Sequence, residues 1–460
     1  MANHHDSLPP QAATQVAPAR VAALAEREQQ RFAETHPNSA HLHARAKRSM
    51  PHGYPMSWFH SLYEHGPIFV ERGEGAWFHD VDGHRYLDVN LADMSQFCGF
   101  GSPPVAEAVA RRAAQGAQFL LPTEDAIWVA EDLARRYGLP QWQFTLSATT
   151  ANVEAMRLAR VATGRSVVLM FDGKYHGHAE EMLFTPSGGG VAPEGMGLDM
   201  GLAHRLRIIP FNDVDALAAA LSPGDVACVV TEPALTNIGV ILPDPEFHTA
   251  LRQVTRAHGT LLLIDETHTQ VCGPGGLTRR WGLMPDLVTL GKSIAGGIPF
   301  GAYGMSDDLA AVFARPDADN PQAEIASGGT LFANAVAMAA ARAAMSDVLT
   351  ADAYEHAAEL GARLADGIDR VAADVGLPWR AHRLYPRSGY AYTGVLPRNA
   401  AEFRAGWRRD IPDLQRVYFA NRGVWEAIYS AGPCVGVAHT TQDVDRYLDV
   451  LAEFTGELTV

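Results

Sequence analysis

Short, continuous apolar runs alternate with helical stretches through the middle of this chain. The runs lie at 166–171, 227–231, 261–264 and 287–290. Apolar residues recur at the spacing of an amphipathic helix over 104–117, 124–137, 150–163 and 246–258. Strands without polar alternation are buried on both faces, and strands separated by helices run parallel in one sheet. We therefore predict an α/β fold with a mostly parallel central sheet covered by helices.

The composition fits a globular protein. The 460 residues are 47% hydrophobic and 19% charged, which supports one large core and a second, smaller one. A net charge of −15 without a basic run argues against a nucleic-acid partner. The N-terminus lacks a signal-peptide pattern and no run reaches about 18 apolar residues, so we expect no export and no membrane span. Four cysteines without a C-x-x-C pair favour a reducing cytoplasm: Cys98, Cys228, Cys272 and Cys434.

Two charged residues near the ends of predicted strands carry the first chemical signal. Asp265 closes the run 261–264, and Lys292 follows the run 287–290. Ligands bind at the carboxyl ends of parallel strands. A lysine able to form a Schiff base and a carboxylate able to protonate a pyridine nitrogen are the minimum equipment for pyridoxal 5′-phosphate (PLP) chemistry. The chain is therefore a candidate PLP enzyme.

Each member of this pair also has an ordinary interpretation. An apolar strand ending in Asp-Glu is also the pattern of a Walker B motif in an ATPase. However, Asp286 stands where the matching Walker A loop needs its first glycine. Lys292 taken alone, before the glycine-rich stretch 295–299, could be a surface lysine. The combination with the motifs below favours the PLP interpretation.

Several short motifs follow one another in an order typical of one family. They are Asp-x-Asp-Gly-x-x-Tyr-x-Asp at 80–88, Ser-Ala-Thr-Thr-Ala at 147–151, Tyr-His-Gly at 175–177, Glu-Pro at 232–233, Asp-Glu-Thr at 265–267, Gly-Lys at 291–292, Gly-Gly-Thr at 328–330 and Ala-His-Thr at 438–440. With them the chain resembles the class III aminotransferases of PLP fold type I, particularly their glutamate-1-semialdehyde aminomutase-like branch. The resemblance implies that fold, with a smaller α+β domain beside the sheet, and PLP as cofactor.

The resemblance gives the central residues their roles. Lys292 would carry the cofactor as a Schiff base and later move a proton. Asp265 would keep the pyridine nitrogen protonated. Ser147, Ala148 and Thr149 precede the predicted helix 150–163, whose N-terminal N–H groups suit the cofactor phosphate. An ordinary Ser/Thr helix cap is compatible with this role.

Further cofactor contacts follow from the same resemblance. Tyr175 would stack on one face of the ring and Thr267 would lie against the other, with His176 and Glu232 nearby. His176 and His178 have the spacing of metal ligands but lack a convincing third, so we predict no metal site. In the family the position of Thr330 contacts the cofactor phosphate of the partner subunit, which implies a homodimer.

Two motifs depart from the family pattern at the cofactor. The phosphate motif usually reads Ser-Gly-Thr-Glu-Ala, but here Ala148 replaces the glycine and Thr150 the glutamate. Because alanine resists positive φ, the loop should stay in ordinary backbone space. Thr267 replaces the usual valine and adds a hydroxyl beside the ring.

A third departure concerns the substrate. Several amino-acid-specific members carry an arginine after a Met-Pro-Gly-like segment, but residues 50–59 contain none. A substrate carboxylate must then be absent or held elsewhere, and Arg387 is a weak substitute. Tyr54, Trp58 and Phe59 would suit an apolar or aromatic substrate arm, although each could equally be a core or dimer contact.

The predicted reaction is transamination. An amine or an α- or β-amino acid would donate its amino group and a 2-oxo acid would accept it, with ping-pong kinetics. The alternative is an aminomutase or racemase acting on a single amino-acid substrate, because the same lysine serves those reactions. A PLP-binding protein without turnover is a remote third alternative.

The domain division completes the prediction. Residues rich in Ala, Pro, Gln and His at 1–20 should form a flexible arm before a helix at 20–34. An Asp-Gly turn predicts a hairpin at 75–89. We assign 21–100 to a segment shared between small domain and dimer interface, 101–345 to a large PLP-binding domain, and 346–460 to a C-terminal small domain.

Overall fold

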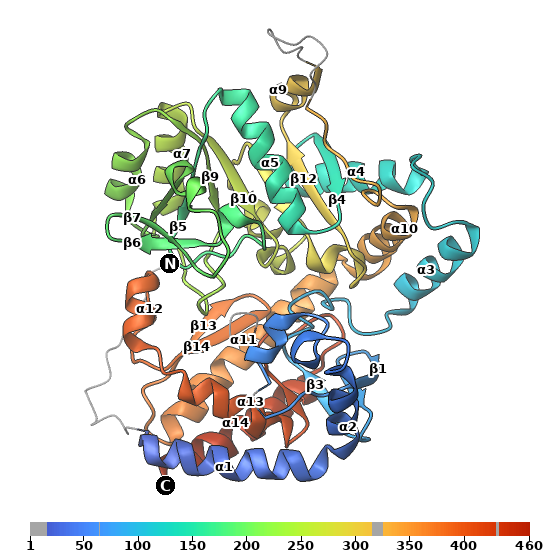
Figure 1. The fold of residues 1–460 in the computed structure, drawn as a ribbon, viewed down its shortest axis with the longest axis vertical. Coiled ribbons are helices and arrows are strands. Elements are labelled where there is room, and N and C mark those ends of the chain that lie inside the picture. The colour runs from blue at the N-terminus through green and yellow to red at the C-terminus, as the bar shows by residue number, and fades with distance from the viewer. Residues whose placement is uncertain (1–15, 64, 315–324, 429–431) are drawn as a thin grey trace.

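A seven-stranded sheet forms the centre of the larger part of the molecule (Figure 1). The computed structural model describes residues 16–63, 65–314, 325–428 and 432–460. In spatial order the strands are β4 (Gln141–Thr145), β12 (Gly301–Met305), β11 (Leu287–Leu290), β10 (Leu261–Asp265), β9 (Val226–Thr231), β5 (Val167–Phe171) and β8 (Leu206–Ile209). Neighbouring strands pair in parallel except at β12, which is antiparallel to both β11 and β4. The predicted mostly parallel sheet is confirmed, and the four apolar runs are β5, β9, β10 and β11.

Both faces of this sheet are buried, as continuous apolar strands require. In β5, Val167, Leu169 and Phe171 belong to one hydrophobic core, while Val168 and Met170 belong to another. Helix α5 packs in the second core, and α4, α7 and α10 pack in the first. The helices of this part are α3 (Pro103–Gln115), α4 (Glu124–Tyr137), α5 (Ala148–Thr163), α6 (Val214–Leu221), α7 (Phe247–Ala257), α8 (Gly276–Arg280), α9 (Asp307–Ala310) and α10 (Ala335–Ala343), and a small hairpin is formed by β6 (Phe184–Ser187) and β7 (Gly190–Pro193).

The four predicted helices are confirmed as α3, α4, α5 and α7, with one difference that matters for the site. Helix α5 begins at Ala148 rather than at residue 150. Ser147 is its N-cap, because the Ser147 hydroxyl accepts a hydrogen bond from the Thr150 N–H and the Thr150 hydroxyl accepts one from the Ser147 N–H. Ala148 and Thr149 therefore form the first turn of the helix instead of a loop ahead of it.

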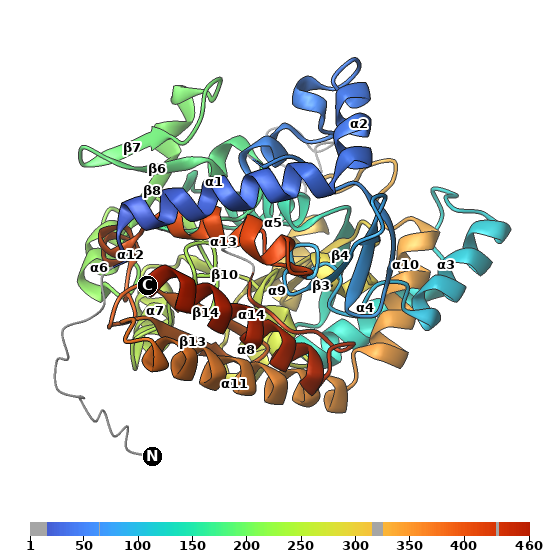
Figure 2. The same ribbon diagram turned by 90° about the horizontal axis from the view of Figure 1, so that it is seen from below.

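The two ends of the chain share a second hydrophobic core (Figure 2). The predicted hairpin is confirmed as β2 (Trp77–Asp80) and β3 (Arg85–Asp88), and β15 (Val424–Trp425) pairs in parallel with β3. The four-stranded sheet β1-β2-β3-β15 thus joins segments from both ends. The remaining elements are α1 (Pro18–Thr35), α2 (Pro37–Ala46), β1 (Val70–Glu74), α11 (Ala351–Asp374), β13 (Arg380–Leu384), β14 (Arg387–Ala391), α12 (Ala400–Gly406), α13 (Asp410–Ala420) and α14 (Thr441–Thr459).

The structure describes only part of the predicted N-terminal arm. Residues 1–15 lie outside the described residues, and α1 already begins at Pro18, so the last three positions of the proposed arm are helical. Within the described ranges, none of the helices combines the length and the apolar character needed to cross a bilayer.

Candidate active site

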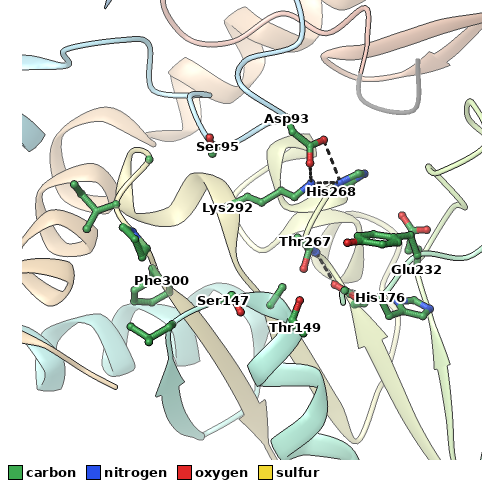
Figure 3. Close-up of a pocket in the computed structure, with 18 residues that line it drawn as sticks. Asp93, Ser95, Ser147, Thr149, His176, Glu232, Thr267, His268, Lys292 and Phe300 are labelled. Atoms are coloured by element: carbon green, nitrogen blue, oxygen red, sulfur yellow. Dashed lines mark hydrogen bonds and ion pairs between the residues drawn. The ribbon is translucent and has the colours of Figure 1, made fainter. Parts of the chain in front are cut away.

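A pocket opens at the carboxyl ends of the central strands (Figure 3). Glu232 follows β9, Asp265 ends β10, and Lys292 lies two residues beyond β11. All three line the pocket, together with residues from the start of α5 and from the segment after β3. The topology therefore gathers residues that are far apart in the sequence at one edge of the sheet.

Lys292 lies between an acid and an imidazole. Its Nζ is 2.6 Å from Asp93 Oδ2 and makes a close contact with His268 Nε2. The backbone of Lys292 has φ of 48°, in the left-handed region that non-glycine residues rarely adopt. Strained backbone of this kind is concentrated at functional sites.

Asp265 is buried and fully hydrogen-bonded. Its Oδ2 accepts bonds from His176 Nδ1 at 2.9 Å and Asn152 Nδ2 at 2.8 Å, and its Oδ1 accepts one from the Thr267 N–H at 3.0 Å. Burial alone would raise the pKa of Asp265, but the bond from His176 and the other donors hold the pKa below its ordinary value. The carboxylate is therefore ionised at neutral pH.

Asn152 is oriented by a neighbouring hydroxyl. Thr289 Oγ1 donates to Asn152 Oδ1 at 2.6 Å, so the amide NH2 faces Asp265 and the His176 carbonyl. Asn152 lies in the second turn of α5. The helix that presents its N-terminus to the pocket therefore also fixes the acid at the pocket floor.

The start of α5 forms the opposite end of the pocket. Ser147, Ala148 and Thr149 all line it, and the first N–H groups of a helix lack partners within the helix. Ala148 is not among the residues with positive φ, which confirms the prediction that the loop stays in ordinary backbone space. Gly177 packs so closely that a Cβ there would lie 2.2 Å from Thr149 Oγ1, which explains the glycine of the Tyr-His-Gly motif.

A chain of polar contacts connects Glu232 to Arg387 behind the pocket. Thr236 Oγ1 donates to Glu232 and lies 2.7 Å from His268 Nδ1. Arg387 Nη1 lies 3.0 Å from the same nitrogen. Burial raises the pKa of Glu232 to about 7.

His268 is neutral in this arrangement. Burial, and then the charges of Lys292 and Arg387, hold the pKa of His268 well below its usual range. Its Nδ1 faces Arg387 Nη1 and Thr236 Oγ1, and its Nε2 faces Lys292 Nζ.

The structure gathers most of the predicted site residues but not all. Nine lie in the pocket wall: Ser147, Ala148, Thr149, Tyr175, His176, Glu232, Asp265, Thr267 and Lys292. Five do not line it: Thr330, Arg387, Tyr54, Trp58 and Phe59.

The five predicted residues that do not line the pocket lie elsewhere in the structure. Thr330 is exposed, and Arg387 is 2% exposed and lies behind His268. The ring of Phe59 lies beside the rings of Tyr54 and Trp58. Predicting their positions would have required knowing how the segment 50–63 folds over α2 and β15.

Three residues of the site escaped the sequence analysis. Asn152 directly follows the Ser-Ala-Thr-Thr-Ala motif, and His268 directly follows Asp-Glu-Thr, so both lie next to recognised motifs. Asp93 had no such signal, because its place depends on the backbone path after β3.

One cluster outside the pocket has metal-ligand spacing in the described part of the chain. Ligand atoms of His36, Asp80 and His84 lie within 4.8 Å of one another. These atoms already have partners, since His36 Nε2 is 2.7 Å from Tyr86 Oη, and Asp80 Oδ2 accepts from Tyr86 at 2.8 Å and contacts His84 Nδ1 at 3.0 Å. His176 and His178 are not part of this cluster.

The fold and this site define a PLP-dependent enzyme of fold type I. The sequence model for aminotransferase class-III matches residues 60–376, and the chain belongs to that family. A glutamate-1-semialdehyde 2,1-aminomutase of Chloroflexus aggregans is 35% identical over 413 residues, which cover 85% of this chain and 91% of the relative. The cofactor is PLP.

Solved structures agree in fold over nearly the whole chain. A glutamate-1-semialdehyde-aminomutase from Pseudomonas aeruginosa PAO1 matches with a TM-score of 0.91 and 38% identity, covering 96% of this chain and 99% of that one. The same protein was solved as a lysine-to-alanine variant in complex with PMP. An omega-transaminase from Sphaerobacter thermophilus matches with a TM-score of 0.83 and 30% identity, covering 91% of this chain and 97% of that one.

Proposed function

We propose that this chain is a PLP-dependent aminomutase, which moves an amino group between neighbouring carbons of one small substrate. The observation that carries the proposal is the pocket of Lys292 and Asp265 in a chain 35% to 38% identical to proteins named as aminomutases. This differs from the transaminase that the sequence analysis favoured, and glutamate 1-semialdehyde is the first substrate to test.

The pocket offers groups that suit PLP. Thr267 Oγ1 and His176 Nε2 are buried atoms without a hydrogen-bond partner among the described residues, and both residues line the pocket. The N-terminus of α5, at Ala148 and Thr149, fits a phosphate, since helix N-termini bind anions. An ionised Asp265 fits a protonated ring nitrogen.

The roles of the chain's residues follow from these positions. When bound, PLP supplies an aldehyde that bonds to amines and a ring that withdraws electrons. Lys292 Nζ would hold the aldehyde carbon and, once displaced, would take up and return the proton of the amine-bearing substrate carbon. His268 Nε2 would orient Lys292 Nζ, and Tyr175 and Thr267 would flank the ring.

Transamination is the second candidate, and a specific observation favours it. Residues 50–59 lack the arginine with which several family members hold a substrate carboxylate. Arg387, the substitute considered from the sequence, lies behind His268 instead of in the pocket wall. A substrate different from that of the aminomutases is consistent with this, so the test also includes an amine donor with a 2-oxo acid acceptor.

We further propose a homodimer in which Thr330 reaches the partner's cofactor. Thr330 is exposed, and its carbonyl accepts a hydrogen bond from Gln118. Phe119, Leu120 and Leu121 follow Gln118 and are 46%, 72% and 72% exposed, an apolar stretch that a second copy would cover. We retain the domain division, with 101–345 as the PLP-binding part and 21–100 joining 346–460.

One experiment separates the two reactions. The PLP-loaded protein is incubated with glutamate 1-semialdehyde alone, and the position of the amino group in the product is followed by NMR. Formation of the isomer without a 2-oxo acid, and its loss in Lys292→Ala, would support the aminomutase. If product appears only after pyruvate or 2-oxoglutarate is added, the chain is a transaminase.

A further inference from the structure

A left-handed helical turn without glycine lies at the edge of the pocket. Leu91, Ala92, Asp93 and Met94 have φ angles of 53°, 45°, 55° and 70°. This conformation is unfavourable for L-residues, whereas achiral glycine adopts it readily, and consecutive residues rarely adopt it. Other contacts must hold the turn, and backbone strain beside an active site points to a functional use.

The contacts that hold the turn come from β3. The buried carboxylate of Asp88 accepts hydrogen bonds from the backbone N–H groups of Asn90, Leu91 and Ala92 at 2.8, 2.9 and 3.0 Å. The Leu91 carbonyl then accepts from the Gln96 N–H at 2.8 Å, which closes the turn. Leu91 and Met94 are 2% and 0% exposed, so their side chains anchor the turn in the core.

This turn aims Asp93 at the reacting end of the pocket (Figure 3). Asp93 Oδ2 lies 2.6 Å from Lys292 Nζ, and its Oδ1 lies 3.8 Å from His268 Nε2. The side chain of Asp93 is 38% exposed, so a molecule in the pocket can reach it.

Asp93 differs from the other two carboxylates of the pocket. The Asp265 carboxylate accepts hydrogen bonds from three donors, and the Glu232 carboxylate accepts hydrogen bonds from Thr236. Within the described ranges, Asp93 forms an ion pair with Lys292 and lies 3.8 Å from Nε2 of the neutral His268. When Lys292 Nζ holds the cofactor, it is no longer a free ammonium, and the Asp93 carboxylate faces the space that a substrate enters.

We infer that Asp93 is a specificity residue. It binds an ammonium group of the substrate and disfavours any substrate with a carboxylate on the amine-bearing carbon, because two carboxylates would then face each other beside Lys292. The preferred class is therefore primary amines and amino aldehydes rather than α-amino acids. This inference rests on the proposed function insofar as the substrate must reach Lys292.

The test compares ligands that differ by one carboxylate. Affinities of the PLP-loaded protein for 2-phenylethylamine and phenylalanine, and for ethylamine and alanine, are measured from the change in cofactor absorbance, without a second substrate. The variant is Asp93→Asn, since asparagine tolerates the left-handed region as well as aspartate does. The matched control is Asp449→Asn, which makes the same change on an exposed position of α14.

The expected result is a preference of the native protein for the amine of each pair. Asp93→Asn should lower the ratio of amine to amino-acid affinity by about 10- to 100-fold, the worth of one charge-assisted hydrogen bond. Its PLP content should equal that of Asp449→Asn, whose ratio should stay native. The inference is overturned if the native protein prefers the amino acids, if no amine binds, or if Asp93→Asn leaves the ratio unchanged. None of these readings depends on a 2-oxo acid, so a failure of the aminomutase proposal is seen separately.

Discussion

The left-handed turn after β3 should lose its shape when Asp88 is replaced by alanine. That change leaves three backbone N–H groups without their acceptor. The hydrogen bonds from Asn90 and Leu91 are buried and that from Ala92 is part-buried. Each unsatisfied buried donor costs about 1–3 kcal/mol, so we expect a loss of about 3 kcal/mol. Four left-handed L-residues already cost roughly 1–2 kcal/mol each in conformational free energy, so the turn is only marginally stable.

Hydrogen exchange of the peptide 88–96 measures this effect locally, without requiring two-state unfolding of the whole chain. A loss of about 3 kcal/mol in opening free energy corresponds to roughly a hundredfold faster exchange at Asn90, Leu91 and Ala92. Protection in α14 should stay native and serves as the control for the fold. The amine-to-amino-acid affinity ratio should fall together with the protection, because the turn positions Asp93.

Asp88→Asn provides a graded comparison. Asparagine keeps one carbonyl oxygen for the Asn90 and Leu91 N–H groups but turns an NH2 toward the Ala92 N–H. Exchange should therefore rise less than in Asp88→Ala. If exchange at 90–92 changes by less than about threefold in Asp88→Ala while α14 keeps its protection, Asp88 does not hold the turn and the argument fails.

Three further changes test other parts of the structure. Lys292→Ala should lower turnover by at least about a thousandfold, measured as initial rate, because it removes both the attachment point and the proton-transfer group. Asn152→Ala should lower the free energy of unfolding in urea by about 2–3 kcal/mol, because it removes the amide that donates to Asp265 and to a backbone carbonyl; unchanged stability would show that these bonds contribute little. Burial raises the pKa of Glu426 from 4.5 to about 8, so the folded protein keeps a proton that the unfolded chain releases, and this stabilisation is lost as the pH rises from 4.5 to 8. Gln415 Nε2 and Tyr447 Oη both donate to the same oxygen of Glu426, and the amide oxygen of Glu426→Gln can still accept both bonds. Because this variant cannot ionise, its unfolding free energy relative to that of the native protein should rise by about 3–5 kcal/mol between pH 5 and pH 9.

The sequence predicted the parallel strands β5, β9, β10 and β11 because they are buried, but not β8, which is only partly buried. It also did not predict β4 or β12, and β12 carries Gly301 and Gly304 in a five-residue strand. These glycines are there because the backbone passes close to its neighbours: a Cβ on Gly301 would lie 2.3 Å from the Ser147 carbonyl oxygen, and one on Gly304 would lie 2.5 Å from the Trp142 ring. Such contacts are tertiary, and local patterns of hydrophobicity do not contain them.

The same limit applies to the site. Lys292 and Asp265 could be predicted because each follows a recognisable strand, and the order of motifs then identified the cofactor. Asp93 could not, because no local rule predicts four consecutive left-handed residues without glycine. Its position depends on Asp88 and on the core that holds Leu91 and Met94.

The two ends of the pocket therefore have different roles: one fits the cofactor, and the other faces the substrate. The end formed by Asp265, Asn152 and the start of α5 is built around a ring nitrogen and a phosphate, and it suits PLP with any substrate. The end formed by Asp93 and His268 surrounds the atom of Lys292 that reacts, and here the chemistry depends on the substrate. A neutral His268 beside Arg387 places its Nε2 against Lys292, while Asp93 presents a partly exposed carboxylate to an incoming amine. Changes at this end should consequently alter which amine reacts while leaving PLP binding intact, whereas changes at the other end should weaken PLP binding for every substrate alike.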